Sequence, residues 1–227
     1  MSYPNDKLTI KDLSHSYSDG QRNVDVLKKV NVTFEAGRLY AIVGESGSGK
    51  TTLISLISAL DEIQKGDVLF NDKSIKQIGG QKFRQRHVNI VFQSFNLIKY
   101  MTARENVEVG LDFAGHTKNG KERAYELLEE VGISREQSDS LVQRLSGGQQ
   151  QRVAIARSIA GDVPIIVADE PTGNLDEDTE AKILQIFKRL AENGKIVIVV
   201  THSHKVASHA DAIVYRMKAG ELARTQR

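Results

Sequence analysis

The stretch "LYAIVGESGSGKTTLISLISAL", residues 39–60, constrains the fold of this chain more than any other part of the sequence. Its apolar run, Leu39 to Gly44, is typical of a strand buried on both faces of a parallel sheet. A glycine-rich loop follows the strand at once, and "KTTLISLISAL" then has the pattern of a helix. A strand, a tight glycine-rich loop and a helix in this order are typical of α/β proteins, so we expect an α/β fold.

The loop in this stretch also fits the GxxxxGK[ST] pattern of a phosphate-binding loop. Glycines let backbone amides close around a β-phosphate, Lys50 places a positive charge between the β- and γ-phosphates, and the Thr51 hydroxyl can ligate Mg²⁺. A Gly/Ser turn with a chance lysine is the alternative, which the preceding strand and the following helix disfavour. We predict that the nucleotide is bound by Gly44, Glu45, Ser46, Gly47, Ser48, Gly49, Lys50, Thr51 and Thr52.

The rest of the chain alternates between strand-like and helix-like segments. Two N-terminal segments, 7–13 and 30–34, alternate with period two, while "VNIVFQ", "VPIIVAD" and "KIVIVVTH" read as buried strands. From Thr102 to Ile159 the periodicity is helical, with almost no strand signal. We therefore predict one domain over residues 1–227. Its phosphate-loop core would be a mostly parallel sheet with an antiparallel N-terminal β part, and a helical subdomain at approximately 94–160 would be inserted in that core.

Two carboxylates, Asp169 and Glu170, end the apolar strand "IIVADE". Ligands of α/β sheets bind in the crevice at such strand ends. Asp169 would hold Mg²⁺, and Glu170, which points in a different direction, could act on the attacking water as base or orienter. A helix-capping acid beside a surface acid is the alternative, and the four apolar residues before the pair disfavour it.

Composition narrows the class of protein further. The chain has no cysteine, which excludes disulfides and thiolate metal sites and suits a reducing compartment. The formal net charge is only +2, so the sequence shows neither the strong positive charge typical of nucleic-acid-binding proteins nor an acidic tail. The longest apolar runs are of strand length, whereas a membrane helix needs about 20 apolar residues. We expect a soluble chain without a signal peptide, which could still bind a membrane protein.

The segment "LSGGQ", Leu145 to Gln149, is called the signature motif below. It places a serine and two glycines at the start of the helix-like run "QQRVAIARSIA", a second seat for a phosphate. The sequence places no lysine and no Mg²⁺ ligand near Leu145 to serve a second nucleotide. In this order and spacing, "GESGSGKTT", "LSGGQ" and "ADEPTGNLD" resemble the ATPase subunits of ABC transporters over essentially the whole chain. The resemblance is greatest to the subfamily of macrolide exporters, lipoprotein-release ATPases and the cell-division ATPase.

This resemblance implies roles for several further residues. Tyr17 matches the aromatic residue that stacks on adenine, although a core tyrosine at a strand edge is the alternative. Gln93 matches the glutamine that reaches Mg²⁺ and the attacking water. His202 matches the histidine that contacts the γ-phosphate, with a strand-end capping histidine as the alternative; the acid that usually follows it is Ser203 here, for which we expect a minor effect. The predicted catalytic residues are thus Glu170, His202, Lys50 and Gln93, and the predicted metal ligands are Thr51, Gln93 and Asp169.

The resemblance also implies that ATP, bound with Mg²⁺, holds two chains together. Ser146, Gly147, Gly148 and Gln149 of one chain would cap the γ-phosphate held by Lys50 of another, and Asp176 would reach across to the other subunit. The partner would be a second copy of this chain or a paralogous ATPase subunit. ATP would join the subunits and hydrolysis would release them.

A membrane partner is implied as well. Residues Gln93–Met101 match the region that receives a short cytoplasmic helix of an integral membrane permease, although part of it would instead belong to the core of the helical subdomain. The chain would then be cytoplasmic and peripheral on the inner face of the cell membrane. We expect no regulatory domain after "KAGEL" and no nucleic acid partner. A cell-division-type signalling ATPase stays an alternative, whereas one phosphate loop without sustained heptads disfavours a soluble ABC ATPase acting on DNA or the ribosome.

Overall fold

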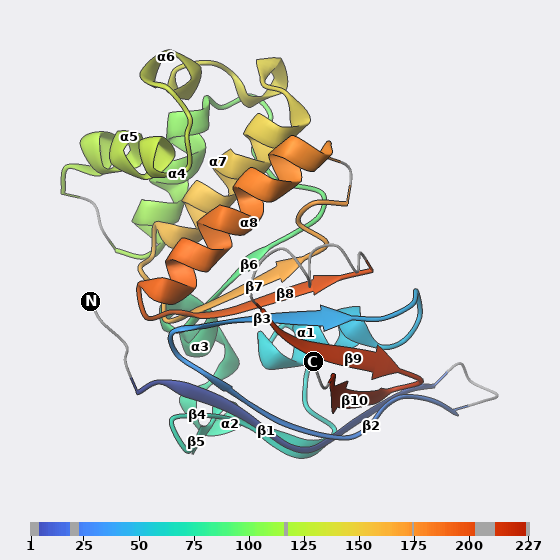
Figure 1. Ribbon diagram of the computed structural model, residues 1–227. Coiled ribbons are helices and arrows are strands. Elements are labelled where there is room, and N and C mark those ends of the chain that lie inside the picture. The colour runs from blue at the N-terminus through green and yellow to red at the C-terminus, as the bar shows by residue number, and fades with distance from the viewer. Residues whose placement is uncertain (1–4, 19–22, 116–117, 174, 203–211, 226–227) are drawn as a thin grey trace.

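The computed structural model describes residues 5–18, 23–115, 118–173, 175–202 and 212–225, which form two sheets with helices between and above them (Figure 1). One sheet has six strands in the order β10-β9-β3-β8-β7-β6, and the other has four in the order β2-β1-β4-β5. The strands are β1 (Lys7–Ser18), β2 (Asn23–Glu35), β3 (Arg38–Val43), β4 (Lys65–Phe70), β5 (Lys73–Ser74), β6 (Val88–Val91), β7 (Ile165–Asp169), β8 (Ile196–Thr201), β9 (Ile213–Lys218) and β10 (Glu221–Arg224).

The larger sheet is parallel except at β10, which pairs antiparallel with β9. Its central strands are apolar throughout because both faces are covered. In β8, Ile196, Ile198 and Val200 belong to the core shared with the smaller sheet. Val197 and Val199 belong to the core under the helices. Successive side chains of a strand point to opposite faces of the sheet, so one continuous apolar run contributes to two separate cores.

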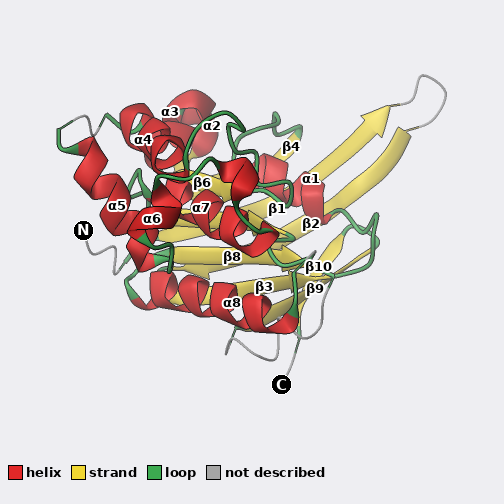
Figure 2. Cartoon of the chain, turned by 90° about the horizontal axis from the view of Figure 1, so that it is seen from above, coloured by secondary structure: helices red, strands yellow, loops and turns green. Residues whose placement is uncertain are grey.

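Helices cover both faces of this sheet. They are α1 (Lys50–Ile57), α2 (Ile75–Ile78), α3 (Gly80–Arg86), α4 (Ala103–Phe113), α5 (Gly120–Glu130), α6 (Arg135–Ser138), the 3₁₀ turn η1 (Val142–Arg144), α7 (Gly147–Ile159) and α8 (Glu177–Glu192). Figure 1 shows α7 and α8 over the parallel sheet, α4 to α6 beyond them, and α1 between the two sheets. Seen from above, the long strands β1 and β2 extend to one side of this assembly (Figure 2).

The fold class predicted from the sequence is confirmed, and three elements differ in length from the prediction. β1 and β2 are longer than the alternating segments because they pair with each other from Lys7↔Glu35 to Ser18↔Asn23, across several bulges. Such bulges interrupt the period-two pattern, so the alternation ends before the strand does. Helix α1 is shorter than the predicted run and ends at Ile57, since Ala59 has a positive φ of 54°.

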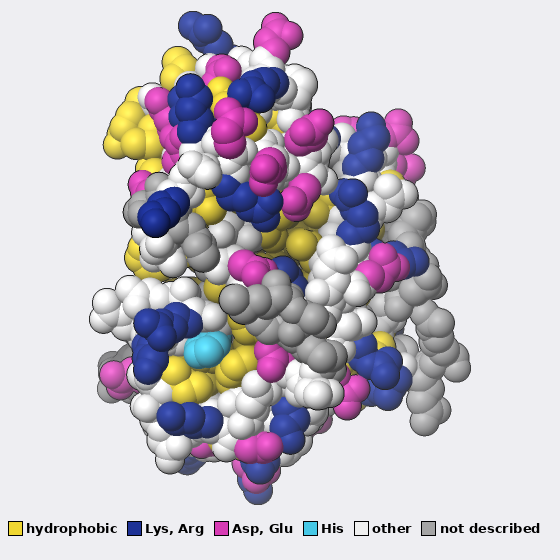
Figure 3. Space-filling model, turned by 90° about the vertical axis from the view of Figure 1, so that its left-hand side faces the viewer, with side chains coloured by type: hydrophobic (Ala, Val, Ile, Leu, Met, Phe, Trp, Pro, Cys, Tyr) yellow, Lys and Arg dark blue, Asp and Glu magenta, His cyan; other side chains and the backbone are white. Residues whose placement is uncertain are grey.

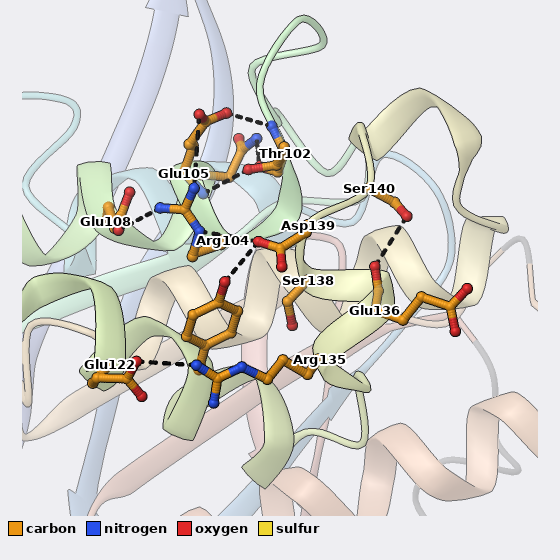
Figure 4. A network of polar contacts seen from close by, with 12 residues as sticks. Thr102, Arg104, Glu105, Glu108, Glu122, Arg135, Glu136, Ser138, Asp139 and Ser140 are labelled. Carbon is orange, nitrogen blue, oxygen red and sulfur yellow. Dashed lines mark hydrogen bonds and ion pairs between the residues drawn. The ribbon is translucent and has the colours of Figure 1, made fainter.

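A polar network joins α4, α5 and α6 at the outer end of the helices (Figure 4). Arg104 contacts Glu108 at 2.7 Å and Asp139 at 3.3 Å, and the Tyr125 hydroxyl donates to Asp139 at 2.7 Å. This hydroxyl, followed by Arg104, holds the pKa of the Asp139 carboxyl below its ordinary value. Two backbone hydrogen bonds then tie residues 101–103 to residues 140–142, just ahead of the signature motif.

Candidate functional site

The glycine-rich loop joins the end of β3 to the first turn of α1. Gly47 needs its freedom here, since its φ is +77° and the space beside it is open. Gly49, the N-cap residue of α1, has a φ of +108°, and a Cβ on it would lie 2.8 Å from the carbonyl oxygen of Val26. Because Gly49 has no side chain to cap the helix, the amides of the first turn are open to an anion.

Lys50 is buried and folds back over this loop. Its ammonium group donates to the carbonyl oxygens of Gly44 at 2.8 Å and Glu45 at 2.9 Å. The lysine therefore closes the loop into a ring around a concave side lined by backbone amides. Such a ring holds a positive charge next to a nest of N–H groups, the arrangement that binds phosphates.

The two carboxylates stand where β7 ends. Asp169 is the last residue of the strand, and Glu170 leaves it with a left-handed φ of +46°. Its amide donates to the carbonyl of Val200 on the neighbouring strand β8 at 2.8 Å. This backbone angle ends the extended strand at Glu170, so the two acids are not placed as successive residues of a regular strand would be.

One cavity of about 390 Å³ brings the predicted catalytic and metal-binding side chains together. It is lined by Ser46, Gly47, Gly49, Lys50, Thr51, Thr52, Gln93, Asp169, Glu170 and His202. These residues follow the carboxyl ends of β3, β6, β7 and β8, which are neighbours in the sheet. The parallel order of these strands is therefore what gathers the site at one edge.

The electrostatics of the cavity are unfavourable to the protein alone. Burial, followed by repulsion from Glu170, raises the pKa of the Asp169 carboxyl above its ordinary value, while Lys50 acts in the opposite direction. Oε2 of Glu170 is buried and makes no well-aligned hydrogen bond. The Nδ1 atom of His202 lies 3.0 Å from that oxygen. A cation or a proton donor brought in with a ligand would relieve this strain.

The oxygen donors of the cavity fit Mg²⁺. The Thr51 hydroxyl, the Gln93 amide oxygen and the Asp169 carboxylate are the hard oxygen ligands that this ion prefers. Within the described part of the chain no cluster of three or more histidine or acidic side chains could hold a metal by itself. Mg²⁺ suits such a sparse set, since it is commonly held by one or two carboxylates together with substrate phosphates.

Tyr17 lies near this cavity without lining it. Its ring is 49% exposed, and its hydroxyl lies 3.4 Å from the Thr52 hydroxyl in the first turn of α1. The ring of His15 meets it edge-on at 4.8 Å. A half-exposed ring beside the phosphate loop is able to stack on a base, and this role for Tyr17 stays a prediction.

The signature motif does not line the cavity. Ser146 caps α7 in a capping box, in which its hydroxyl accepts from Gln149 and its own amide donates to the Gln149 side chain. The two glycines occupy the first turn, whose N–H groups have no partner within a helix. Asp176 caps α8, with its carboxylate accepting from the amide of Thr179 at 2.9 Å and from its hydroxyl at 2.8 Å.

Two residues of functional interest, Arg157 and Thr179, were not predicted from the sequence. The Arg157 guanidinium donates to the carbonyl oxygens of Asn96 at 2.8 Å and Phe95 at 3.1 Å. Both Phe95 and Asn96 have a positive φ. It thus fixes the loop after Gln93 to α7, and no local pattern predicts this. Thr179 lies three residues after Asp176, a spacing that could have indicated the helix cap. Asn174, which is part of "ADEPTGNLD", and Ser203, which follows His202, lie outside the described residues.

Comparison with known proteins gives a consistent set of relatives. The family model described as ABC transporter matches residues 27–173. The ABC transporter ATP-binding protein YclH of Bacillus subtilis is 45% identical over 199 residues, which are 87% of this chain and 88% of that protein. The macrolide export ATP-binding/permease protein MacB of Pasteurella multocida is 39% identical over 95% of this chain, but this match covers 33% of MacB.

Solved structures agree with these relatives. A dimeric structure of MJ0796, an ABC transporter cassette from Methanocaldococcus jannaschii, superposes with a TM-score of 0.86 at 36% identity, covering 97% of this chain and 99% of that one. A second dimeric structure, of a post-hydrolysis state of the MJ0796 cassette with ADP and Pi, has the same TM-score and identity.

Proposed function

Since this chain is an ATPase that belongs to the ABC transporter family, we propose that it powers a membrane transporter or extruder through the ATP-driven, head-to-tail pairing of two such chains. The single observation that carries the proposal is the cavity in which the phosphate loop, Gln93, Asp169, Glu170 and His202 meet. Four adjacent strand ends supply these groups, and together they provide both a phosphate seat and a place for an attacking water.

Each residue of the cavity has a role that follows from its position. The loop amides and Lys50 bind the β- and γ-phosphates. Glu170 accepts the proton of the attacking water, and Gln93 orients that water. His202, beside Glu170, donates to a γ-phosphate oxygen and neutralises the charge that develops there. Bound Mg²⁺, held by Thr51, Gln93 and Asp169, would supply further neutralisation of the phosphate oxygens.

Pairing of two chains would complete this site. The start of α7 offers two glycines and a serine at a helix N-terminus, yet its own chain's cavity is lined without it. The dimeric MJ0796 structures show that a cassette of this shape can pair. In the proposed dimer the signature motif of each chain covers the γ-phosphate held by Lys50 of the other.

A permease is the proposed membrane partner. The MacB relatives carry ATP-binding and permease parts in one protein. In this chain the side chains of Tyr100 and Phe113 are 79% and 65% exposed, on or beside α4. Figure 3 shows hydrophobic side chains at the surface of the upper, helical part of the molecule, among charges of both signs. In the described ranges, no helix has the length and apolarity needed to cross a bilayer. The proposed location is therefore the inner face of the membrane, through the permease.

The activity is tested by ATP hydrolysis with and without Mg²⁺. Lys50→Ala should abolish turnover, since Lys50 is the cation that lines the phosphate-binding side of the cavity. Glu170→Gln should keep ATP binding and lose most turnover, because glutamine matches the shape but does not accept a proton. Size-exclusion chromatography of this variant with ATP should show a dimer. Turnover that is unchanged in Lys50→Ala, or a monomer with ATP bound, would contradict the proposal.

The partner is tested by crosslinking the purified chain to membrane vesicles from its own cells. The chain has no cysteine, so a single cysteine introduced at position 100 is the one thiol of the purified protein that can carry a photoreactive group. We expect it to crosslink to an integral membrane protein, to be identified by mass spectrometry. A cysteine at Val24, which is exposed on β2 at the other side of the molecule, is the matched control. Equal crosslinking from both positions would count against the proposed permease surface.

A further inference from the structure

We propose that Thr179 is a positioning residue for the signature motif: its methyl group supports Gly148 and so sets where the first turn of α7 lies. The inference rests on the proposed function, because it concerns the seat that this turn would offer to the γ-phosphate of another chain. It assigns a role to a side chain that lies outside the phosphate loop, the acid pair and the signature motif.

Thr179 leaves no room for a side chain at position 148. A Cβ atom built on Gly148 would lie 2.5 Å from the Cγ2 methyl of Thr179, a separation that real Cβ atoms essentially never show. The next atoms of Thr179 would be 3.4 Å and 3.5 Å away. The methyl group alone therefore occupies the space that any side chain at position 148 would need.

Thr179 is itself held in place. Its amide donates to Oδ1 of Asp176 at 2.9 Å, and its hydroxyl donates to Oδ2 of the same carboxylate at 2.8 Å. Because both the hydroxyl and the methyl are on Cβ, fixing the hydroxyl also fixes the methyl. Asp176 thus directs the methyl of Thr179 at Gly148, within one chain, whatever Asp176 does in a dimer.

The neighbouring glycine provides a contrast. Among the described residues, a Cβ on Gly147 would meet only Cδ2 of Leu175, at an ordinary distance of 3.8 Å. Neither glycine has a positive φ, so alanine is allowed by the backbone at both positions. The two sites are in the same helical turn and differ in what their own chain places beside them.

This contrast defines the experiment. The variants are Gly148→Ala, Thr179→Ser, the double variant Gly148→Ala/Thr179→Ser, and the matched pair Gly147→Ala and Gly147→Ala/Thr179→Ser. Serine keeps the hydroxyl that Asp176 binds and removes the methyl. We expect Gly148→Ala to lower ATPase activity by about tenfold or more, the scale of an overpacked contact. Thr179→Ser should restore the Gly148→Ala variant to within about threefold of Thr179→Ser alone. It should give no rescue of Gly147→Ala.

A second measurement separates this inference from the proposed function. Hydrogen exchange of the amides of Gln150 and Gln151, without nucleotide, reports the first turns of α7 directly. Gly148→Ala should speed their exchange, Thr179→Ser should reverse that, and Gly147→Ala should leave it unchanged. A wild-type chain without ATPase activity would refute the proposed function while the exchange data still decide the contact. Normal activity and exchange in Gly148→Ala, absence of rescue in both measurements, or equal rescue of Gly147→Ala would overturn the role of Thr179.

Discussion

Nδ1 of His202 lies 3.0 Å from Oε2 of Glu170, across the ends of the neighbouring strands β8 and β7. The glutamate side chain is 14% exposed and the histidine side chain is 64% exposed. The mostly buried Glu170 carboxylate therefore lies beside the more exposed imidazole of His202. Glu170, the proposed base, and His202, the proposed ligand of the γ-phosphate, are thus in direct contact, and removing either side chain changes the environment of the other.

This contact predicts that the two residues act together in turnover. His202→Ala should lower kcat by about 10²-fold, within the range of one catalytic proton or charge contact. Added to Glu170→Gln, it should cause little further loss, because the first change has already disabled this pair. Single-turnover ATP hydrolysis of the wild type, both single variants and the double variant gives the test. Losses that simply multiply would show that the residues act independently.

The raised pKa of Asp169 predicts that removing its charge stabilises the fold, although the proposed activity needs that charge. When a carboxyl has a higher pKa in the folded than in the unfolded chain, the folded protein loses stability as the pH rises. The loss begins near the ordinary pKa of the carboxyl, about 3.8, and is complete above its pKa in the folded chain. At pH 7 Asp169 therefore destabilises the nucleotide-free chain. Asp169→Asn should raise its unfolding free energy by about 1 kcal/mol, or Tm by roughly 2–4 °C, while abolishing Mg²⁺-dependent turnover.

The matched control for that prediction is Asp139→Asn. The pKa of Asp139 is lowered, first by the Tyr125 hydroxyl, so its contribution to stability is present above its ordinary pKa and is lost as the pH falls through the folded value. This variant should lower the melting temperature at pH 7, the opposite sign. Calorimetric scans at pH 7 without nucleotide compare the two. A drop in melting temperature for Asp169→Asn would contradict the proposed electrostatics of the cavity.

Tyr17 should bind ATP through its ring rather than its hydroxyl, since the hydroxyl makes only a 3.4 Å contact with Thr52. Tyr17→Ala should weaken ATP binding by roughly 1–3 kcal/mol, the scale of base stacking in nucleic-acid-binding proteins, and Tyr17→Phe hardly at all. Titration with a fluorescent ATP analogue measures both. Val24→Ala, opposite Tyr17 on β2, is the control for disturbing the strand pair. Equal weakening by Phe and Ala would assign the binding to the hydroxyl.

The head-to-tail arrangement predicts rescue between two inactive variants. Lys50→Ala spoils the phosphate loop, and Ser146→Arg blocks the glycine-lined seat with bulk. Each homodimer should be inactive, but a mixed dimer combines both defects in one site and leaves the other whole. Mixing should therefore restore at most about half of the activity per mixed dimer if the sites act independently. ATP-dependent crosslinking of Ser146 to the phosphate loop of its own chain would refute the arrangement in trans.

Much of the fold could be predicted because its signals are local. A glycine just after a helical run is a common signal for the end of a helix, and Gly132 and Gly194 follow α5 and α8 with positive φ angles of 78° and 88°. The Asn71-Asp72 turn also has positive φ at both residues, as a tight hairpin requires. The extent of β1 and β2 could not be read, because bulges set by cross-strand pairing interrupt their alternation.

The sequence by itself determined the strand, loop and helix around Lys50 and the position of an acid pair at a strand end, since both follow from periodicity and composition over a few residues. Only the tertiary structure decided that β3, β8, β7 and β6 are neighbours, so that residues far apart in the chain share one cavity. It also decided the contacts of Glu170 with His202 and of Thr179 with Gly148. Such contacts depend on strand order, on a left-handed φ at Glu170 and on how two helices pack, and no local pattern of side chains encodes these.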